Sequence, residues 1–117
     1  MQLTEITYSD ARPVDGYGPG FFRVAGQVIE GAMLITANAA RSWGGIEDSA
    51  TLIALAGEVD VLILGTGAET ALPPKPLREA LEEAGIGVEP MASPAACRTY
   101  NVLLAEGRRV ALAALPV

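Results

Sequence analysis

A glycine-containing turn and a later helical segment hold the residues of this sequence that could bind a ligand or a partner. The turn directly follows the apolar run 59–64, and the helical segment begins at Ser93. Ligands of open α/β sheets usually bind at the carboxyl ends of parallel strands, so a turn and a helix start on that edge are candidates for a shared site. The seven candidate residues are Gly65, Thr66, Gly67, Ser93, Arg98, Tyr100 and Asn101.

The turn Gly65-Thr66-Gly67 has the form of the first half of a dinucleotide-binding fingerprint, and Glu89 lies about twenty residues further on, where an acid that binds ribose is expected. Thr70 stands where the third glycine is needed, and three prolines between 73 and 76 delay the helix whose N-terminus would hold the pyrophosphate. A tight turn at a strand end is therefore favoured over a dinucleotide site.

The helical segment from Ser93 to Gly107 offers several polar groups. Ser93 is predicted to cap the helix, with Pro94 in its first position. Arg98, one turn further on, could bind an anion together with the free N–H groups of the helix start; a solvated surface arginine is the alternative. Asn101 is polar in mid-helix and, if buried, needs hydrogen-bond partners, which we expect to be the peptide groups of the turn 65–67.

Cys97 and Tyr100 lie on the same segment. Cys97 is interpreted as a small buried residue, although a thiol near a helix N-terminus can be activated, which leaves a redox-sensing role as a weaker alternative. Tyr100 is interpreted as a packed aromatic residue rather than as an acid catalyst.

The composition excludes several classes of site. The sequence has no histidine, which excludes a Ser-His-Asp triad, a Cys-His pair and the usual zinc sites. Its single cysteine excludes an internal disulfide and a Cys-x-x-Cys motif. No metal and no cofactor are predicted.

Charge and hydropathy bear on partners and location. The net charge is −6, and seven of the eight cations are arginines, of which only Arg108 and Arg109 are adjacent. Because an acidic surface repels phosphate backbones, nucleic-acid binding is not predicted. No apolar run approaches the ~20 residues of a membrane span, and the first residues lack the pattern of a signal peptide. We therefore expect a cytoplasmic protein without membrane insertion.

The elements that must position the candidate residues form a βαβ pattern over 59–91, in which an apolar run, a helix that ends at Gly85 and a second apolar run follow one another. The segment 93–107 adds a helix and 108–115 a final strand. A short helix capped by Asp48 or Ser49 precedes this unit and ends at Gly57. Trp43 is interpreted as a buried anchor, with ligand stacking as the alternative.

The N-terminal third is rich in predicted strands, at 3–8, 21–24, 27–30 and 32–36, which single glycines separate as in a hairpin or meander. Residues 10–20 contain two prolines and three glycines and are predicted to be a loop. Residues 1–117 are therefore predicted to form a single α/β domain, with a mixed central β-sheet, a β-rich N-terminal hairpin region and helices packed on the sheet.

The chain resembles a known family in two groups of motifs. The first includes Gly16-Tyr17-Gly18, Phe21-Phe22-Arg23-Val24, Trp43 and Leu64-Gly65-Thr66-Gly67, and the second is the run 93–103 followed by Glu106-Gly107-Arg108-Arg109. These motifs are similar to those of the small Mth-938-like domains, also called domain of unknown function 498, a family that includes the mitochondrial respiratory complex I assembly factor 3. The resemblance covers nearly the whole chain. It implies an α/β domain with a mixed sheet, no established enzymatic activity and, by likeness to the mitochondrial relatives, action through protein partners; the chain looks like a bacterial, free-standing version.

The sequence favours a non-catalytic protein-binding or assembly-factor-like domain, related to the assembly of respiratory complex I, and leaves enzymatic activity open. The partner is an unidentified protein, and a homodimer is plausible because a small apolar-rich domain leaves surface to cover. The alternative function is a small-molecule protein or enzyme that binds an anion or acyl carboxylate through the Gly-Thr-Gly turn with Arg98 and Asn101.

Overall fold

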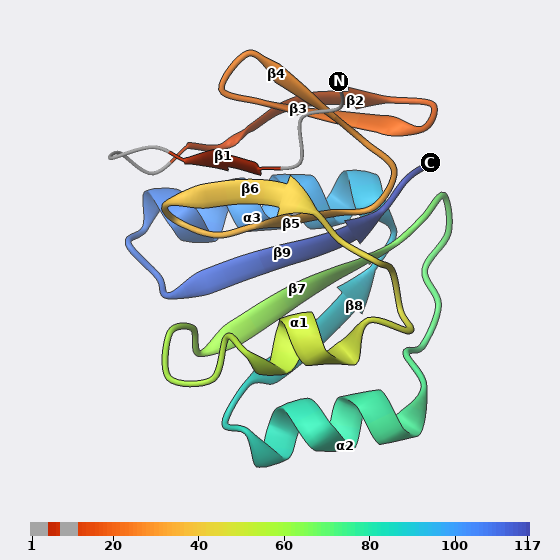
Figure 1. The fold of residues 1–117 in the computed structure, drawn as a ribbon, viewed down its shortest axis with the longest axis vertical. Helices are drawn as coiled ribbons and strands as arrows, with labels where there is room; N and C mark the ends of the chain where they lie inside the picture. The colour runs from red at the N-terminus through yellow and green to blue at the C-terminus, as the bar shows by residue number, and fades with distance from the viewer. Residues whose placement is uncertain (1–4, 8–11) are drawn as a thin grey trace.

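The computed structural model describes residues 5–7 and 12–117 (Figure 1). Residues 3, 4 and 8 of the predicted first strand lie outside the described residues, as do residues 10 and 11 of the predicted loop. In chain order, the elements are β1 (Glu5–Thr7), β2 (Val14–Gly18), β3 (Phe21–Val24), β4 (Gln27–Glu30), β5 (Met33–Ile35), β6 (Ala39–Ser42), α1 (Ser49–Ile53), β7 (Val61–Thr66), α2 (Lys75–Glu83), β8 (Gly87–Met91), α3 (Ser93–Ala105) and β9 (Val110–Leu115).

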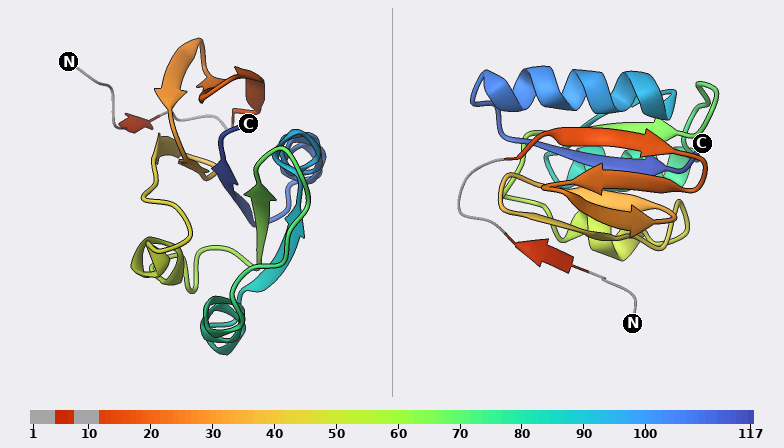
Figure 2. Two further views of the ribbon diagram at one scale, coloured as in Figure 1. Left: turned by 90° about the vertical axis from the view of Figure 1, so that its right-hand side faces the viewer. Right: turned by 90° about the horizontal axis from the view of Figure 1, so that it is seen from above.

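The large sheet is mixed and has the strand order β1-β6-β5-β9-β7-β8. β7 pairs in parallel with β8 and β9, whereas β5 and β6 are antiparallel to their neighbours. The predicted βαβ unit is confirmed as β7-α2-β8. The chain then returns through α3 to β9 on the other side of β7. The crossover through α2 runs from β7 to β8, and the crossover through α3 runs back across the sheet from β8 to β9. Crossovers between parallel strands are normally right-handed, so two crossovers in opposite directions place α2 and α3 on opposite faces of the sheet (Figure 2).

Each face of the sheet has its own apolar core. On one face, α3 and the small antiparallel sheet β2-β3-β4 enclose Phe22, Ile29, Met33, Ile63, Ala96, Cys97, Tyr100 and Leu112, among others. On the other face, α1 and α2 cover Leu34, Trp43, Leu52, Leu62, Leu64, Leu77, Leu81 and Ala113, among others. Successive residues of β7 and β9 therefore alternate between the two cores, which explains why these strands read as unbroken apolar runs.

The predicted helices are confirmed with small shifts. In α2, Leu77 and Leu81 are buried and Gly85 follows in the left-handed conformation, with a φ of 86°. Asp48 is the N-cap of α1, and its side chain accepts a hydrogen bond from the Thr51 N–H. Trp43 is 5% exposed and its Nε1 donates to the Asp48 carbonyl at 3.1 Å, so the interpretation as a buried anchor is confirmed.

The prediction of a loop over residues 10–20 is wrong, because Val14–Gly18 form β2, which pairs with β3 through an irregularity between Val14 and Gly16. A β-bulge tolerates glycine and interrupts the alternation of buried and exposed side chains. Without a regular alternation, the sequence of this strand resembles that of a loop. The predicted hairpin of β3 and β4 is confirmed, with a turn at Ala25 and Gly26, both of positive φ. After Gly31 the chain leaves the small sheet and enters the large one as β5.

Gly65 lies inside β7 at a point where the start of α3 packs closely against the strand. A Cβ atom at this position would lie 2.7 Å from the Ser93 Oγ and 3.0 Å from the Ala114 Cβ. The absence of a side chain here allows the start of α3 to sit directly on the sheet.

We therefore expect Gly65→Ala to lower the free energy of unfolding by about 1–3 kcal/mol through overpacking. Urea unfolding followed by circular dichroism measures this change. The control is Gly16→Ala in β2, where a Cβ meets nothing within 4 Å and φ is not in the left-handed region. Equal stability of the two variants would contradict the close-approach explanation.

Candidate functional site

Three hydrogen bonds of Ser93 join the start of α3 to the ends of β7 and β9. The Gly67 N–H donates to the Ser93 Oγ at 2.9 Å, and the Ser93 N–H donates to the Gly67 carbonyl at 2.7 Å. The Ser93 hydroxyl donates to the Leu115 carbonyl at 2.6 Å, which ties the end of β9 to the same point. The predicted proximity of the strand end and the helix start is thus confirmed.

Ser93 does not cap α3, so that prediction is wrong. The N-cap residue is Ala92, which makes no side-chain cap bond, and Ser93 is the first residue of the helix. Ser93 is 1% exposed, and its hydroxyl is already used as acceptor from Gly67 and donor to Leu115. The Ser93 hydroxyl thus forms hydrogen bonds with two backbone groups at the ends of β7 and β9 instead of accepting from a free N–H at the start of α3.

Thr66 fixes the loop between β7 and α2. Its hydroxyl donates to the Glu69 carbonyl at 2.6 Å, lies 3.1 Å from the Met91 carbonyl and accepts from the Ala71 N–H at 3.0 Å. The loop occupies residues 67–74, and α2 begins only at Lys75. The helix N-terminus is therefore separated from the Gly-Thr-Gly turn, as the prolines of this segment predict, and a dinucleotide phosphate would not meet it at the turn.

Asn101 binds the backbone of β2 rather than the turn, so its predicted partners are wrong. Its Oδ1 accepts from the Val14 N–H at 2.8 Å and its Nδ2 donates to the Val14 carbonyl at 3.1 Å. The side-chain amide thus pairs with both backbone groups of Val14 as a neighbouring strand would. This pair fastens α3 to the small sheet.

The structure does not bring the seven candidate residues into one site. Gly65, Thr66, Gly67 and Ser93 lie together at the ends of β7, β8 and β9. Tyr100 is fully buried in the α3-side core, and Asn101 lies at β2. Arg98 is exposed on α3, and its side chain makes no hydrogen bond or ion pair with another described residue, in agreement with the solvated alternative.

Among the described residues, Cys97 and Asp48 have shifted pKa values with clear causes. Burial raises the pKa of the Cys97 thiol to about 11, so the environment of Cys97 opposes formation of a thiolate. The pKa of Asp48 is lowered, first by the hydrogen bond from the Thr51 hydroxyl at 2.7 Å. Asp48 braces the turn before α1, which the sequence indicated only as a helix cap.

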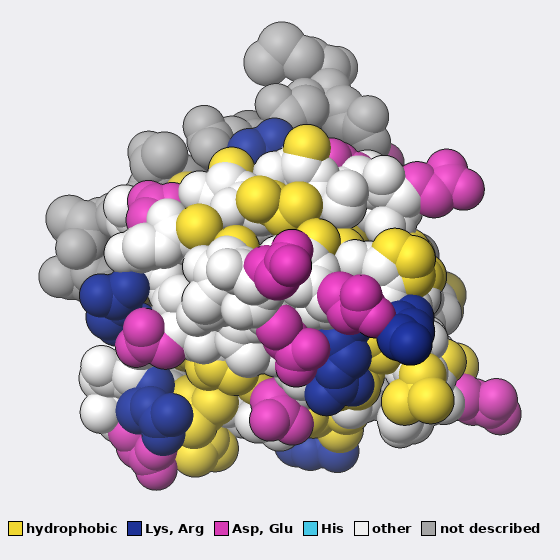
Figure 3. Space-filling view, turned by 90° about the horizontal axis from the view of Figure 1, so that it is seen from below, with side chains coloured by type: hydrophobic (Ala, Val, Ile, Leu, Met, Phe, Trp, Pro, Cys, Tyr) yellow, Lys and Arg dark blue, Asp and Glu magenta, His cyan; other side chains and the backbone are white. Residues whose placement is uncertain are grey.

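Charges on the outer face of α2 form pairs rather than a site. Lys75 and Glu79 are 3.7 Å apart, and Arg78 and Glu82 are 3.6 Å apart, all on exposed side chains. Acidic and basic side chains are interspersed on this side of the molecule (Figure 3). Among the described residues, no three His, Cys, Asp or Glu side chains are grouped so that they could hold a metal ion. No helix in the described part of the chain is long and apolar enough to cross a membrane.

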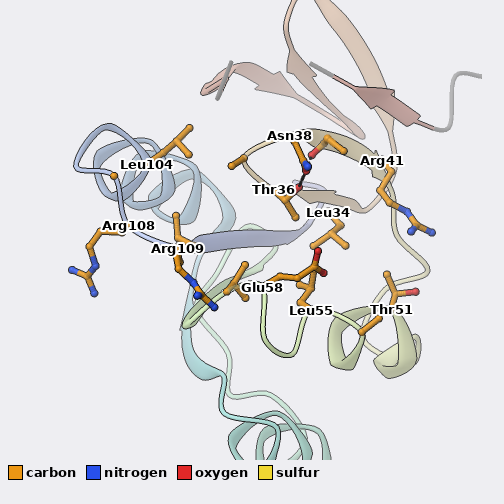
Figure 4. A pocket seen from close by; sticks show the side chains of 16 residues that line it. Leu34, Thr36, Asn38, Arg41, Thr51, Leu55, Glu58, Leu104, Arg108 and Arg109 are labelled. Carbon is orange, nitrogen blue, oxygen red and sulfur yellow. Dashed lines mark hydrogen bonds between the residues drawn. The ribbon is translucent and has the colours of Figure 1, made fainter. Parts of the chain in front are cut away.

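Sequence reasoning missed a pocket at the opposite end of the sheet, with a volume of about 580 Å³. Arg41, Arg108 and Arg109 line it together with Glu58 (Figure 4). The adjacent pair Arg108-Arg109 was a signal of it, but Arg41 joins that pair only through the pairing of distant strands.

We expect Asn101→Asp to lower the free energy of unfolding by about 1–3 kcal/mol at pH 7, because a carboxylate cannot donate to the Val14 carbonyl. The Val14 N–H favours the charged form of the new carboxyl, but we expect the repulsion from the Val14 carbonyl to dominate and to raise the folded-state pKa above its ordinary value, so that the folded variant binds more protons than the unfolded one. The loss relative to the parent chain is therefore smallest at low pH and grows as the pH rises through the folded-state pKa. Urea unfolding at pH 4 and pH 7 measures this dependence.

Asn38→Asp serves as the control for this substitution. Asn38 is exposed, and its Oδ1 accepts a hydrogen bond from the Thr36 hydroxyl at 3.0 Å, which a carboxylate oxygen can also accept. Its replacement should change the stability little at either pH. A loss in Asn101→Asp that is the same at both pH values would contradict the role of Val14.

We expect Cys97 to resist thiol reagents in the folded protein, because a pKa of about 11 leaves roughly one thiol in a thousand ionised at pH 8. Ellman's reagent should react within minutes in urea and far more slowly without it. The rate in the folded state should rise about tenfold per pH unit below the pKa. Rapid labelling of the folded protein at pH 7 would show instead that Cys97 is accessible and activated.

The fold and the sequence have known relatives. A Rhodobacter capsulatus protein described as uncharacterized is 54% identical over 117 residues, which cover 100% of this chain and 94% of the relative. The zebrafish (Danio rerio) NADH dehydrogenase (ubiquinone) 1 alpha subcomplex assembly factor 3 is 32% identical over 107 residues, which cover 86% of this chain and 62% of that protein. The chain is thus a distant homologue of assembly factor 3 and spans less than two thirds of the zebrafish protein.

Solved structures show the same architecture. A Bartonella henselae structure described as an outer membrane protein superposes with a TM-score of 0.83 at 34% identity, over 92% of this chain and 97% of the other. A Bordetella pertussis protein described as a Mth938-like domain gives 0.77 at 29% identity, over 99% and 92%. Residues 14–115, from the start of β2 to the end of β9, match the family described as "Protein of unknown function (DUF498/DUF598)". The resemblance found in the sequence is thereby confirmed, and the chain belongs to the DUF498/DUF598 family.

Proposed function

We propose that this chain is a non-catalytic protein-binding domain that acts as an assembly factor in the bacterial cytoplasm, with a subunit of NADH dehydrogenase as its partner. The homology with assembly factor 3 supports this class of function. The Rhodobacter capsulatus relative, which matches over the whole chain, supports a bacterial source. The structural observation that carries the proposal is the outer face of α3.

The α3 surface consists of Arg98, Val102 and Ala105, which are spaced as i, i+4 and i+7 on one side of the helix. All three residues are exposed, and the Val102 side chain is 57% exposed although it is apolar. An arginine beside an exposed aliphatic side chain, on a rigid helix, is a combination that suits a protein partner, because Arg is enriched in binding hot spots and the aliphatic group loses water on contact.

The four candidate residues at the strand ends support this surface rather than a pocket. The hydroxyl groups of Ser93 and Thr66 form hydrogen bonds with backbone groups, and the side-chain amide of Asn101 forms hydrogen bonds with Val14. In this interpretation they hold α3 in place, and only Arg98 among the seven candidates reaches a partner. The alternative function, an anion bound by the Gly-Thr-Gly turn with Arg98 and Asn101, is less favoured because Asn101 already has other partners.

A double variant on the α3 surface tests the proposal. Arg98→Glu with Val102→Gln should leave the fold intact, since both side chains are exposed, and should weaken partner binding at least tenfold. The measurement is affinity purification of the tagged protein from its native cell, with quantitative mass spectrometry. The parent chain should recover NADH dehydrogenase subunits, and the double variant should recover at least tenfold less of them.

The matched control is Arg23→Glu with Val28→Gln. These residues are cross-strand neighbours on β3 and β4, both are exposed, and the substitutions are the same in kind. The control should retain the partners of the parent chain. If the parent chain recovers no protein above a tag-only sample, the protein-binding function is contradicted. If both double variants behave alike, the α3 surface is not the binding site. Analytical ultracentrifugation of the purified chain shows separately whether a second copy is the partner.

A further inference from the structure

The pocket at the other end of the sheet has the size of a small-molecule site. Its volume is about 580 Å³, within the usual range for ligand pockets. It lies where β5 ends and β9 begins, whereas Ser93 and the Gly-Thr-Gly turn lie where β9 and β7 end. The α3 surface and this pocket share no residue, although Leu104 of α3 and the turn after this helix line the pocket.

Small side chains keep the pocket open. It is enclosed by the β5–β6 turn, by the segment after α1 and by the α3–β9 turn. Ala37, Ala39, Ala54 and Gly107 face it where larger residues would fill the space. α1 ends at Ile53, and the following segment turns at Gly57, which has a φ of 83°. The chain thus surrounds the space instead of closing it.

The deeper part of the pocket is apolar. Leu34, Leu55, Val59 and Val110 line it, and each is between 2% and 7% exposed. A bound apolar group would contact these side chains and lose its contact with water.

The rim of the pocket is cationic. Three of the eight cations of this acidic chain line it, with Arg41 on one side and Arg108 and Arg109 on the other (Figure 4). Arg109 is held in place, because its Nη2 donates to the Gly57 carbonyl at 2.8 Å and its Nε lies 3.6 Å from the Asp60 Oδ2. The Arg108 side chain makes no ion pair or hydrogen bond with another described residue. Guanidinium groups in such positions suit carboxylates and phosphates.

Glu58 is the one carboxylate among the lining residues and lies between the two groups of arginines (Figure 4). It repels a bare anion that enters the pocket, so an anion gains most when an apolar group anchors it to the deeper part. The pocket therefore suits an amphipathic anion better than inorganic phosphate, since only the amphipathic anion offsets this repulsion by contact with the apolar lining.

We propose that this pocket binds a small organic anion, a carboxylate or a phosphate monoester, that carries a short apolar group. Arg108 and Arg109 hold the anionic end, and Leu34, Leu55 and Val59 hold the apolar end. This site is independent of the proposed protein-binding function.

Titration of the ¹⁵N-labelled full chain, followed by amide NMR shifts, tests the proposal with four probes. Hexanoate or hexyl phosphate should give saturable shifts at Leu55, Glu58 and Arg109, and the stronger of the two identifies the anionic group. Hexanol, which lacks the charge, and inorganic phosphate, which lacks the apolar group, should each bind at least tenfold more weakly. Equal binding of hexanol, or saturable shifts at Gly67 and Ser93 instead, would overturn the proposal.

Three variants separate recognition from packing. Arg108→Gln should weaken hexanoate or hexyl phosphate binding about tenfold, since it removes one charged contact, whereas Arg41→Gln, on the other side of the pocket, should weaken it less. Glu58→Gln should strengthen binding and raise the affinity for inorganic phosphate. Arg23→Gln, on the outer face of the small sheet, should leave binding unchanged. No saturable binding of either amphipathic anion, or unchanged affinity in both pocket arginine variants, would show that the pocket is not an anion site.

Discussion

The close approach of α3 to the ends of β7 and β9 is the constraint on which the rest of this structure depends. The crossover from β8 to β9 must pass over β7, so the first turn of α3 lies directly on that strand. Gly65 removes the side chain that would stand in the way, and the Ser93 hydroxyl satisfies a donor at Gly67 and an acceptor at Leu115. One hydroxyl thus joins two parallel strands to one helix, at a place where unpaired backbone groups would be costly.

This constraint explains why a segment that reads like a ligand site acts as a structural joint. Glycine and hydroxyl residues after a buried strand are typical of phosphate-binding loops, and also of positions where two backbones meet closely. In this chain the polar groups of Thr66 and Ser93 point to backbone atoms. The two surfaces that we propose for recognition lie elsewhere, on the outer face of α3 and at the opposite end of the sheet.

The sequence predicts the elements with local periodicity and misses the contacts between distant segments. The βαβ unit and α2 follow from apolar runs, one apolar stripe and Gly85, all of which are local. β2 was predicted as a loop because its stability comes from pairing with β3 and from Asn101, which is 87 positions from Val14. The pocket was missed for the same reason, since Arg41 lies beside Leu34 only through the register of β5 and β6. The prediction that Ser93 caps α3 was wrong because the preference of serine for N-cap positions takes no account of nearby strand ends. Here the ends of β7 and β9 bind the Ser93 hydroxyl.

The edge of the large sheet at β8 bears on how a protein partner can bind. The Gly87 N–H donates to the Asp60 carbonyl, so the backbone groups of residue 87 point toward β7. By alternation, the backbone N–H and C=O groups of residues 88 and 90 point toward the free edge of the sheet. One of these two is Pro90, which has no N–H to donate. A strand added at this edge would find a single donor, at Val88, which is too little for main-chain pairing. At this edge, recognition through side chains is therefore favoured over the addition of a strand, which agrees with the proposed use of the outer face of α3.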